Sequence, residues 1–498
     1  MADLFLKMSN VSKHYTGVTA LDQVDFEIYQ GEIHCLVGEN GSGKSTLIKI
    51  ISGNVQPDDG AQIEFEGQVL HGIHAIDAIH KGIDIIYQDL SLFPNLTVME
   101  NIALARYIAE GKRLVDWGEL KEIATKAMAR IDVSLPLEAL VSDIPIADQQ
   151  LVAICRALTR DVKLVIMDEP TASLTKKEVD SLFSVVLDMK KKGISTMFVS
   201  HKLNEVLEIA DRVSVIRDGK MVGIFDPKEL NDEKLTQLMT GKKLEYTPYV
   251  RGEVAQEPIL EVCNLSARGL FQDISFKLFP GEILGITGLL GSGRTELALA
   301  LFGVNLPDSG EIFFEGRPIH IRSIQQAIDL GIAFVPEDRL VQGLIMNQSV
   351  SKNLVVTTLD DLVDRFKLLD QRLIHDKIDR WVKDMSIKIP SVDSPVQTLS
   401  GGNQQRVVLT KWIATNPKVL ILDGPTIGID VAAKHAIHQI IRDLASTGIG
   451  IILISDEILE VCNNTNRLLV MHKGRLVKEF EMEHTTMDEI QETVDLTA

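Results

Sequence analysis

The most informative stretch of the chain reads Gly38-Glu39-Asn40-Gly41-Ser42-Gly43-Lys44-Ser45, and Thr46 follows it. It matches the spacing G-x-x-x-x-G-K-S, in which the glycines let backbone N–H groups close around phosphate oxygens at the start of a helix. We expect residues 33–37 to form the strand before this loop and residues 44–52 to form the helix after it. Lys44 would reach the β- and γ-phosphates of a nucleotide, and the Ser45 hydroxyl would bind Mg²⁺. Many unrelated NTPases share the loop, so by itself it indicates only a nucleotide.

A second copy of the loop reads Gly288-Leu289-Leu290-Gly291-Ser292-Gly293-Arg294-Thr295, with arginine in place of lysine. Gly31-Glu32-Ile33 likewise recurs as Gly281-Glu282-Ile283. We therefore interpret the 498 residues as two similar halves, 1–243 and 258–498, joined by a short linker at 244–257.

Both halves have the pattern of an α/β fold, because short apolar runs alternate with amphipathic segments. The sequence predicts tandem P-loop domains, each with a mostly parallel sheet. Helix-like stretches without sheet motifs predict a helical subdomain at about 90–142 in the first half and at about 338–398 in the second.

Composition excludes several classes of protein. The chain has 51 Lys and Arg against 70 Asp and Glu, a net charge of −19, which is a poor basis for gripping nucleic acid. No apolar run approaches the roughly 18 residues of a membrane span, and the N-terminus lacks the pattern of a secretory signal. Four isolated cysteines show no disulfide or zinc spacing. We therefore expect a location in a reducing cytoplasm.

An apolar run ends in Asp168-Glu169-Pro170-Thr171. An Asp at the end of a strand can hold a metal through water, and the adjacent Glu can polarise an attacking water. Such a pair is often plain surface charge. Its spacing along the sequence from Lys44, and the positions of Gln88 and His201 in the same sequence pattern, favour a catalytic role. We expect Glu169, His201 and Gln88 to be catalytic, and Ser45, Gln88 and Asp168 to hold Mg²⁺.

The motif that narrows the class is Leu399-Ser400-Gly401-Gly402-Asn403-Gln404-Gln405. It resembles the LSGGQ signature of the ABC ATPases. With it, nearly the whole chain resembles the fused double-cassette ATP-binding subunit of bacterial sugar importers of the ribose, galactose and xylose type. Ser400 and the glycines would open a helix and present a hydroxyl and bare N–H groups to a γ-phosphate.

In ABC proteins the signature of one cassette completes the ATP site of the other. The resemblance therefore implies that site one joins the first phosphate loop and its catalytic groups to the second signature, with Tyr15 stacked on the adenine. The residues that the second half would supply are Ser400, Gly401, Gly402 and Gln404.

Site two would join the second phosphate loop to the first half's signature, and the departures from the family pattern gather there. Ile144-Pro145-Ile146-Ala147 stands where Leu-Ser-x-Gly is expected, so a residue without an N–H replaces the serine and a Cβ is added at the glycine. Gly424 stands in place of the catalytic Glu, and Asp456 and Glu337 replace the counterparts of His201 and Gln88. No aromatic residue matches Tyr15 before Phe276.

Site two still keeps groups that could bind a nucleotide. These are the loop residues Gly288, Gly291, Gly293 and Arg294, together with Thr295 and Asp423 as metal ligands. We expect site one to hydrolyse ATP and site two to be a structural or regulatory pocket.

The resemblance implies the ATPase motor of an importer for a monosaccharide or related small polar solute. Such a subunit is peripheral, docks on a permease at the cytoplasmic face of the inner membrane and serves an extracytoplasmic solute-binding protein, with ATP and Mg²⁺ as cofactors. The segments 89–101 and 338–353 would receive helices of the permease.

Two alternatives are weaker. Double-cassette ATPases that act on ribosomes or nucleic acid carry a long charged linker, whereas this linker is short. A non-catalytic binding module would not need an intact site one.

Overall fold

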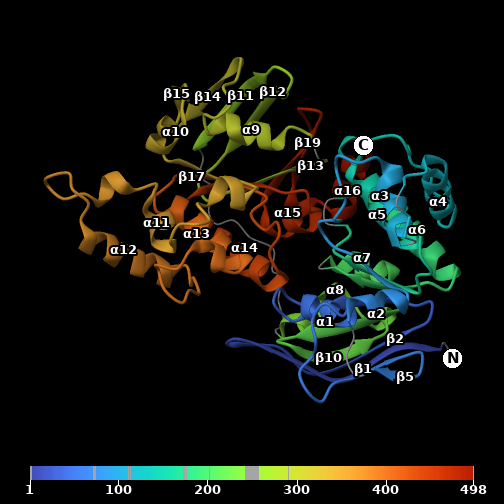
Figure 1. Ribbon diagram of the computed structural model, residues 1–498. Coiled ribbons are helices and arrows are strands. Elements are labelled where there is room, and N and C mark those ends of the chain that lie inside the picture. Colours follow the sequence, from blue (N-terminus) through green and yellow to red (C-terminus); the bar gives the residue numbers. More distant parts are fainter. Residues whose placement is uncertain are drawn as a thin grey trace. The chain divides into compact units, whose positions relative to one another are not determined.

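The computed structural model describes residues 3–70, 74–109, 111–112, 114–171, 174, 176–200, 202–241, 257–289 and 291–496 (Figure 1). The chain folds as two compact units, 1–244 and 245–498. The linker expected at 244–257 lies outside the described residues, except for Glu257. Within the described residues each unit contains one six-stranded and one four-stranded sheet, so the repeat in the sequence is also a repeat of architecture.

The six-stranded sheet of the first unit has its phosphate loop at the end of a central strand. Its order is β10-β9-β3-β8-β7-β6, and all neighbours are parallel except β10 and β9. Every residue of β3 and β8 is buried, which is typical of parallel strands covered on both faces. The strands are β3 (Ile33–Val37), β6 (Ile83–Ile86), β7 (Leu164–Asp168), β8 (Ser195–Val199), β9 (Arg212–Arg217) and β10 (Lys220–Phe225).

An antiparallel sheet of order β2-β1-β4-β5 completes the strands of this unit. It consists of β1 (Leu4–Tyr15), β2 (Val18–Tyr29), β4 (Gln62–Phe65) and β5 (Gln68–Leu70). The helices are α1 (Lys44–Ile51), α2 (Ala75–His80), α3 (Val98–Ala109), α4 (Trp117–Ala129), α5 (Ile146–Leu158), α6 (Lys176–Lys191), α7 (Leu203–Ile209) and α8 (Asp232–Thr240). Among them α3 packs against α4 and α5.

The second unit repeats this plan. Its six-stranded sheet has the order β16-β17-β18-β13-β19-β20 and is parallel except at β20, and its antiparallel sheet has the order β12-β11-β14-β15. The strands are β11 (Leu260–Ala267), β12 (Phe271–Leu278), β13 (Ile283–Gly288), β14 (Ser309–Phe314), β15 (Arg317–Ile319), β16 (Ile332–Val335), β17 (Val419–Asp423), β18 (Gly450–Ile454), β19 (Arg467–His472) and β20 (Arg475–Glu481).

The helices of the second unit include one π-helical turn, Arg339–Gly343, directly after β16. The α-helix α11 packs on both α12 and α13. The α-helices are α9 (Arg294–Leu301), α10 (Ile324–Leu330), α11 (Val350–Val355), α12 (Gln371–Asp384), α13 (Gly401–Ile413), α14 (Val431–Ser446), α15 (Ile458–Asn464) and α16 (Met487–Leu496).

These elements confirm the predicted α/β class with a mostly parallel sheet. The strand expected at 33–37 is β3, and the helix expected at 44–52 ends one residue earlier, with Ser52 as its C-cap. The apolar run before Asp168 is β7, which includes Asp168 as its last residue. Within the described residues no helix is long and apolar enough to cross a bilayer.

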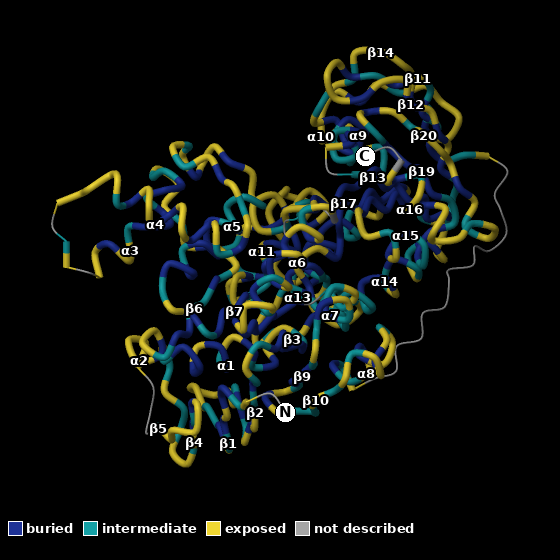
Figure 2. Tube along the Cα trace, turned by 90° about the vertical axis from the view of Figure 1, so that its right-hand side faces the viewer, coloured by how far each residue is buried: buried dark blue, intermediate teal, exposed yellow. Residues whose placement is uncertain are grey.

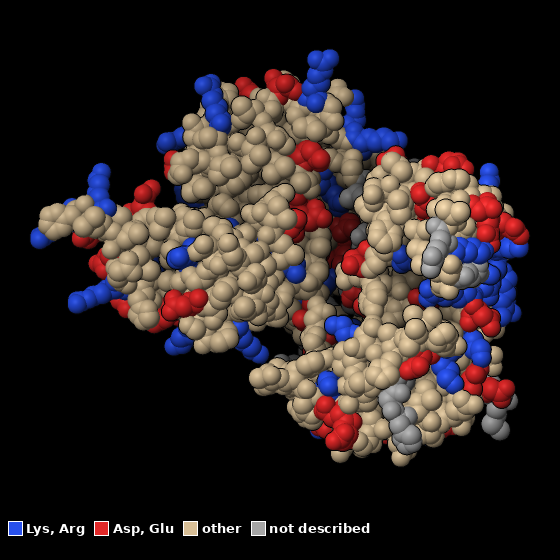
Figure 3. All heavy atoms as spheres, viewed as in Figure 1, with Lys and Arg blue, Asp and Glu red and all other residues tan. Residues whose placement is uncertain are grey.

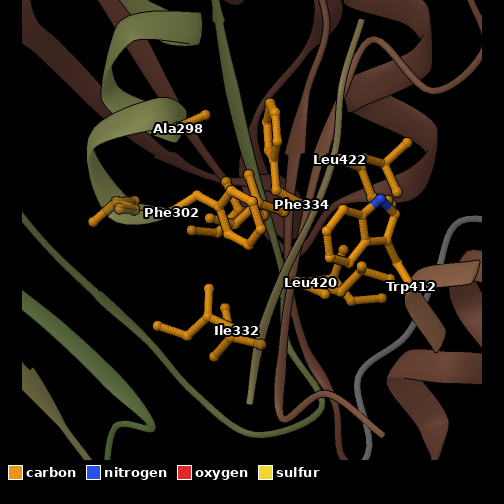
Figure 4. Packing of buried hydrophobic residues seen from close by; sticks show 14 of the residues in the cluster. Ala298, Phe302, Ile332, Phe334, Trp412, Leu420 and Leu422 are labelled. Carbon is orange, nitrogen blue, oxygen red and sulfur yellow. The ribbon is translucent and has the colours of Figure 1, made fainter. Parts of the chain in front are cut away.

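In the core of the second unit, the helix α9 that follows the phosphate loop packs against β16 and α13 (Figure 4). Phe302, at the end of α9, lies 5.5 Å from the Phe334 ring and 5.4 Å from the Trp412 ring, centroid to centroid. Phe334 belongs to β16, and Trp412 belongs to α13. Buried positions follow the sheet strands in both units (Figure 2). Because interiors are close-packed, α9, β16 and α13 hold fixed positions relative to one another.

Candidate nucleotide sites

The first phosphate loop has the backbone that its sequence predicts. Gly43 is the N-cap of α1 at φ 108°, and a Cβ there would lie 2.5 Å from the Ala20 carbonyl oxygen, so only glycine fits. The buried Lys44 donates from Nζ to the carbonyl oxygens of Gly38 (2.6 Å) and Glu39 (2.9 Å). The loop therefore presents backbone N–H groups at a helix N-terminus with an ammonium group beside them, which is a site for phosphate.

Asp168 and Glu169 lie where β7 meets this loop. Burial raises the pKa of Asp168, the adjacent Glu169 raises it further, and Lys44 opposes both effects. Glu169 donates its N–H to the Val199 carbonyl oxygen at 2.8 Å and has φ 51°, in the left-handed region that residues with a side chain rarely adopt. Such a conformation stores roughly 1–3 kcal/mol and gathers at functional sites.

The other residues expected in site one are placed in part. Gln88 is exposed just after β6, and Tyr15 is 46% exposed at the end of β1. Lys13 Nζ lies 5.8 Å from the Tyr15 ring centroid, so the ring lies near a positive charge and in reach of solvent. His201 lies outside the described residues.

In the second unit most positions predicted for site two line one pocket of about 230 Å³, whereas Gly288, the last residue of β13, does not. Gly291, Ser292 and Gly293 of the phosphate loop line it. Five more residues that the sequence analysis singled out also line it, namely Arg294, Thr295, Glu337, Asp423 and Asp456.

Burial disfavours the charged forms of the ionisable side chains in this pocket. Asp423 is 3% exposed, and burial raises its pKa to about 6, with a further rise from Glu337. A hydrogen bond from Thr295 and the nearby Arg294 act in the opposite direction. Burial also lowers the pKa of Arg294, which the surrounding acids partly offset.

Three polar atoms of the pocket residues are buried without a hydrogen-bond partner among the described residues. They are Ser292 Oγ, Arg294 Nη1 and Asp423 Oδ2. Buried polar groups are almost always paired in native proteins, so three orphans in one pocket indicate groups kept for a ligand. A cation, a hydroxyl and a carboxylate together suit a phosphate with its metal.

Gly424 has the same backbone as Glu169, with φ 52° against 51°. A Cβ at Gly424 would lie 2.4 Å from Ile427 Cδ1 and 3.3 Å from Glu337 Cγ. Ile427 therefore fills the space next to the position that carries the carboxylate in the first unit.

A buried hydrogen-bonded network lies behind the pocket. Glu460 accepts hydrogen bonds from the Thr426 hydroxyl (2.8 Å) and the Ser455 hydroxyl (2.5 Å), and His438 Nε2 lies 2.7 Å from it. Burial alone would raise the pKa of Glu460, but His438, the Ser455 hydrogen bond and the charge of Lys434 together hold the pKa below its usual range. The sequence analysis missed this network, because its members are far apart in the chain and form no motif.

The two signature segments share a backbone and differ in chemistry. Ser400 precedes α13 at φ −63°, ψ 155°, and Pro145 precedes α5 at φ −55°, ψ 153°. The Ser400 hydroxyl oxygen accepts from Asn403 Nδ2 at 3.0 Å, which leaves its own proton to donate. Gln404 is buried in the second unit, with its amide near the Val396 carbonyl oxygen.

Comparison with known proteins decides the family. The model of the ABC transporter family matches residues 21–172 and 271–427. This chain belongs to the ABC transporter family. The expected double-cassette architecture is thereby confirmed, and we call the units 1–244 and 245–498 cassette one and cassette two.

Similar proteins include two import subunits. The chain is 41% identical, over 98% of its length and 96% of the relative, to the putative ribose/galactose/methyl galactoside import ATP-binding protein 1 of Agrobacterium fabrum. It is 40% identical, over 98% of each chain, to the xylose import ATP-binding protein XylG of Geobacillus kaustophilus.

The fold also resembles a solved structure of the archaeal ribosome recycling factor aABCE1 in complex with ribosomal stalk protein aP1. The TM-score is 0.63 at 20% identity, covering 97% of this chain and 92% of that one. This likeness concerns the fold.

Magnesium fits the hydroxyl and carboxylate pairs of this ABC protein. No group of three or more His, Cys, Asp or Glu side chains placed to hold a metal occurs among the described residues. Mg²⁺ does not need such a cage, because it takes one or two protein ligands, phosphate oxygens and water. In site two the Thr295 hydroxyl bonds to Asp423, a donor set of that kind.

Proposed function

We propose that this chain is the ATP-hydrolysing motor of an importer for a monosaccharide or a related small polar solute. Its similarity to import subunits extends over nearly the full length of both chains. The observation that supports hydrolysis at a single site is the matching backbone directly after strands β7 and β17. One backbone conformation presents Glu169 in cassette one and Gly424 in cassette two, so only one cassette has a carboxylate for the attacking water.

Hydrolysis in site one follows from the residues that cassette one supplies. The loop N–H groups and Lys44 bind the β- and γ-phosphates, and Glu169 takes the proton of the attacking water. Ser45, Gln88 and Asp168 would hold Mg²⁺, which neutralises charge on the phosphates. Ser400 and the glycines of cassette two would complete the γ-phosphate shell, with His201 beside it.

Site two binds a nucleotide in this proposal and does not hydrolyse it. The orphaned Arg294 Nη1 and Asp423 Oδ2 provide the phosphate and metal contacts. No carboxylate replaces Glu169, and Pro145 supplies neither a hydroxyl nor an N–H from cassette one.

The partners in this proposal are a permease at the cytoplasmic face of the inner membrane and, through it, an extracytoplasmic solute-binding protein. Exposed apolar side chains in the expected docking segments support this. Phe93 is 57% exposed in the first segment, and Val341 is 78% exposed in the second. Isolated exposed apolar residues are common, but two in matching segments of both cassettes suit grooves for permease helices.

A function on nucleic acid is less well supported. On the face shown in Figure 3 acidic and basic side chains are mixed, and basic ones gather beside the helices of cassette one. The lysines at the end of α6 and directly after it are engaged within the fold. Lys190 pairs with Asp211, Lys191 pairs with Asp188, and Lys192 donates to the Arg130 carbonyl oxygen. Paired charges of this kind are a poor phosphate track.

The decisive test is Glu169→Gln. ATP turnover should fall roughly 10²–10⁴-fold, the typical contribution of a positioned general base, while binding of a fluorescent ATP analogue stays within two-fold (an estimate that follows from the untouched phosphate loop). Glu122→Gln, an exposed residue of α4 in cassette one away from both phosphate loops, is the matched control and should keep its turnover. Retention of most turnover by Glu169→Gln would place hydrolysis elsewhere.

Closure of the composite site is tested separately. In a Glu169→Gln chain with probes at Ser42 and Gly401, ATP with Mg²⁺ should shorten the distance within one molecule, because γ-phosphate contacts favour the closed state. A change seen only when two chains associate would show that the sites form between polypeptides. Ligand screening of the solute-binding protein encoded next to this chain would identify the cargo.

A further inference from the structure

One guanidinium in cassette two joins the wall of site two to the next loop of the sheet. Arg339 follows Glu337 by two residues, in the segment after β16. Its Nη1 donates to the Ile427 carbonyl oxygen at 2.5 Å, and its Nη2 donates to the Gly428 carbonyl oxygen at 3.0 Å. Glu337 and Ile427 both line the site-two pocket, so Arg339 fastens two walls of that pocket together.

The same guanidinium contacts the start of the signature helix α13. Arg339 Nε lies 3.5 Å from Gln404 Oε1. A Cβ at Gly401 would lie 2.9 Å from Arg339 Nη2, so the guanidinium packs against the bare backbone of the signature. Three elements thus meet at one side chain, namely the segment after β16, the loop after β17 and the first turn of α13.

Cassette one carries no cation at the matching position. Leu90 stands at the position of Arg339 and is buried. Both cassettes do share a second fastening from the last turn of the signature helix. There Arg156 donates to the Leu90 and Ser91 carbonyl oxygens, and Lys411 donates to the Gly343 carbonyl oxygen. The additional cation occurs in the cassette whose signature is intact.

We propose that Arg339 is a positioning residue that couples ligand binding in site two to the placement of the signature Ser400–Gly402, and thereby to ATP hydrolysis in site one. The inference rests on the composite site one proposed above. A phosphate with its metal in the pocket engages Asp423 and Glu337, and the loop from Gly424 to Gly428 follows the end of β17. Arg339 holds this loop by two charge-assisted hydrogen bonds and carries its displacement to α13.

The coupling predicts a specific pattern in ATPase kinetics. Arg339→Leu introduces the residue of cassette one and should lower kcat about ten-fold, within the usual range of couplings between sites, with KM for ATP nearly unchanged because Lys44 and its loop are untouched. Arg339→Lys keeps the charge but cannot bind both carbonyl oxygens, so its kcat should lie between the kcat of the wild type and that of Arg339→Leu. Arg380→Leu removes an exposed arginine of the same cassette and is the matched control.

A double-mutant cycle separates coupling from general damage. Asp423→Asn weakens ligand binding in site two and should lower kcat in the parent chain, but it should have no further effect in the Arg339→Leu chain. Multiplicative losses, or a parental kcat in Arg339→Leu, would overturn the coupling. If Arg339→Leu does not fold, as judged by its unfolding midpoint, the same cycle is run with Arg339→Lys.

The proposed function and this coupling fail in different ways. Retained turnover in Glu169→Gln removes the composite site on which the coupling depends. An inactive Glu169→Gln together with multiplicative losses in the cycle leaves site one intact and removes only the role of Arg339.

Discussion

Restoring a carboxylate to cassette two by Gly424→Glu should destabilise that cassette without activating it. The backbone at Gly424 has φ 52°, and an added Cβ would lie 2.4 Å from Ile427 Cδ1 and 3.1 Å from its Cγ1. Left-handed backbone costs a residue with a side chain about 1–2 kcal/mol. The clash adds less than overpacking of a core would, because Ile427 Cδ1 is the far end of a side chain that is 39% exposed. The expected loss is therefore about 1–2 kcal/mol from the backbone, before any repulsion between the new carboxylate and Asp423.

Two further variants separate these contributions. Gly424→Ala keeps the strain and the overpacking but adds no charge. Combining it with Ile427→Ala, the residue that the sequence of cassette one has at position 172, should recover the packing component, below about 1 kcal/mol, as a favourable coupling in the double-mutant cycle.

The assay can be confined to cassette two. The chain has three tryptophans, and in a Trp117→Phe background the remaining two, Trp381 and Trp412, both lie in that cassette. Denaturant unfolding followed by tryptophan fluorescence then reports its stability. ATP turnover is measured in parallel with Glu169→Gln present. A Gly424→Glu chain that keeps its unfolding midpoint, or that gains turnover from this one change, would refute the reasoning from backbone strain and packing.

Three other outcomes are expected. Burial lowers the pKa of Lys411 to about 8, so the folded chain binds this proton more weakly than the unfolded chain, and the stability of wild type relative to Lys411→Met should rise by about 3 kcal/mol between pH 8 and 10.5 and stay flat below, measured by denaturant titration. Asp338 accepts from the N–H groups of Leu340 and Val341, and Asp338→Ala should cost about 1 kcal/mol, whereas an equal midpoint would exclude this capping role. Val341→Asp should abolish co-purification with the permease while ATP binding at Lys44 is unchanged, and normal co-purification would exclude this docking segment.

Much of the fold is predictable because a phosphate loop fixes its surroundings. The spacing around Lys44 requires a buried strand before the loop and a helix after it, and β3 and α1 have almost the predicted bounds. The apolar run before Asp168 predicts a strand end in the same way, and Asp168 ends β7 as Asp423 ends β17. These elements are predictable because the residues that determine them lie close together in the sequence.

What the sequence does not predict depends on contacts between distant residues. Arg339 meets Gly428, 89 residues further along the chain, and nothing near either residue indicates the contact. The left-handed backbone at Glu169 is also hidden, because a glutamate does not suggest the conformation that Gly424 would. The signal in the sequence is the alignment of the two halves, in which Glu169 aligns with Gly424 and Leu90 aligns with Arg339.

The shared bend at Glu169 and Gly424 gives the divergence of the two cassettes a direction. A duplicated gene starts with the same strained position in each copy. Glycine at this position has no side chain to strain and no carboxylate, so Gly424 makes its cassette easier to fold while lacking the general base that we propose for Glu169. Once a side chain such as Ile427 has grown into the freed space, the reverse step must overcome both strain and crowding. A cassette in this state does not readily regain a carboxylate after β17, so selection for the proposed hydrolysis acts on the other copy.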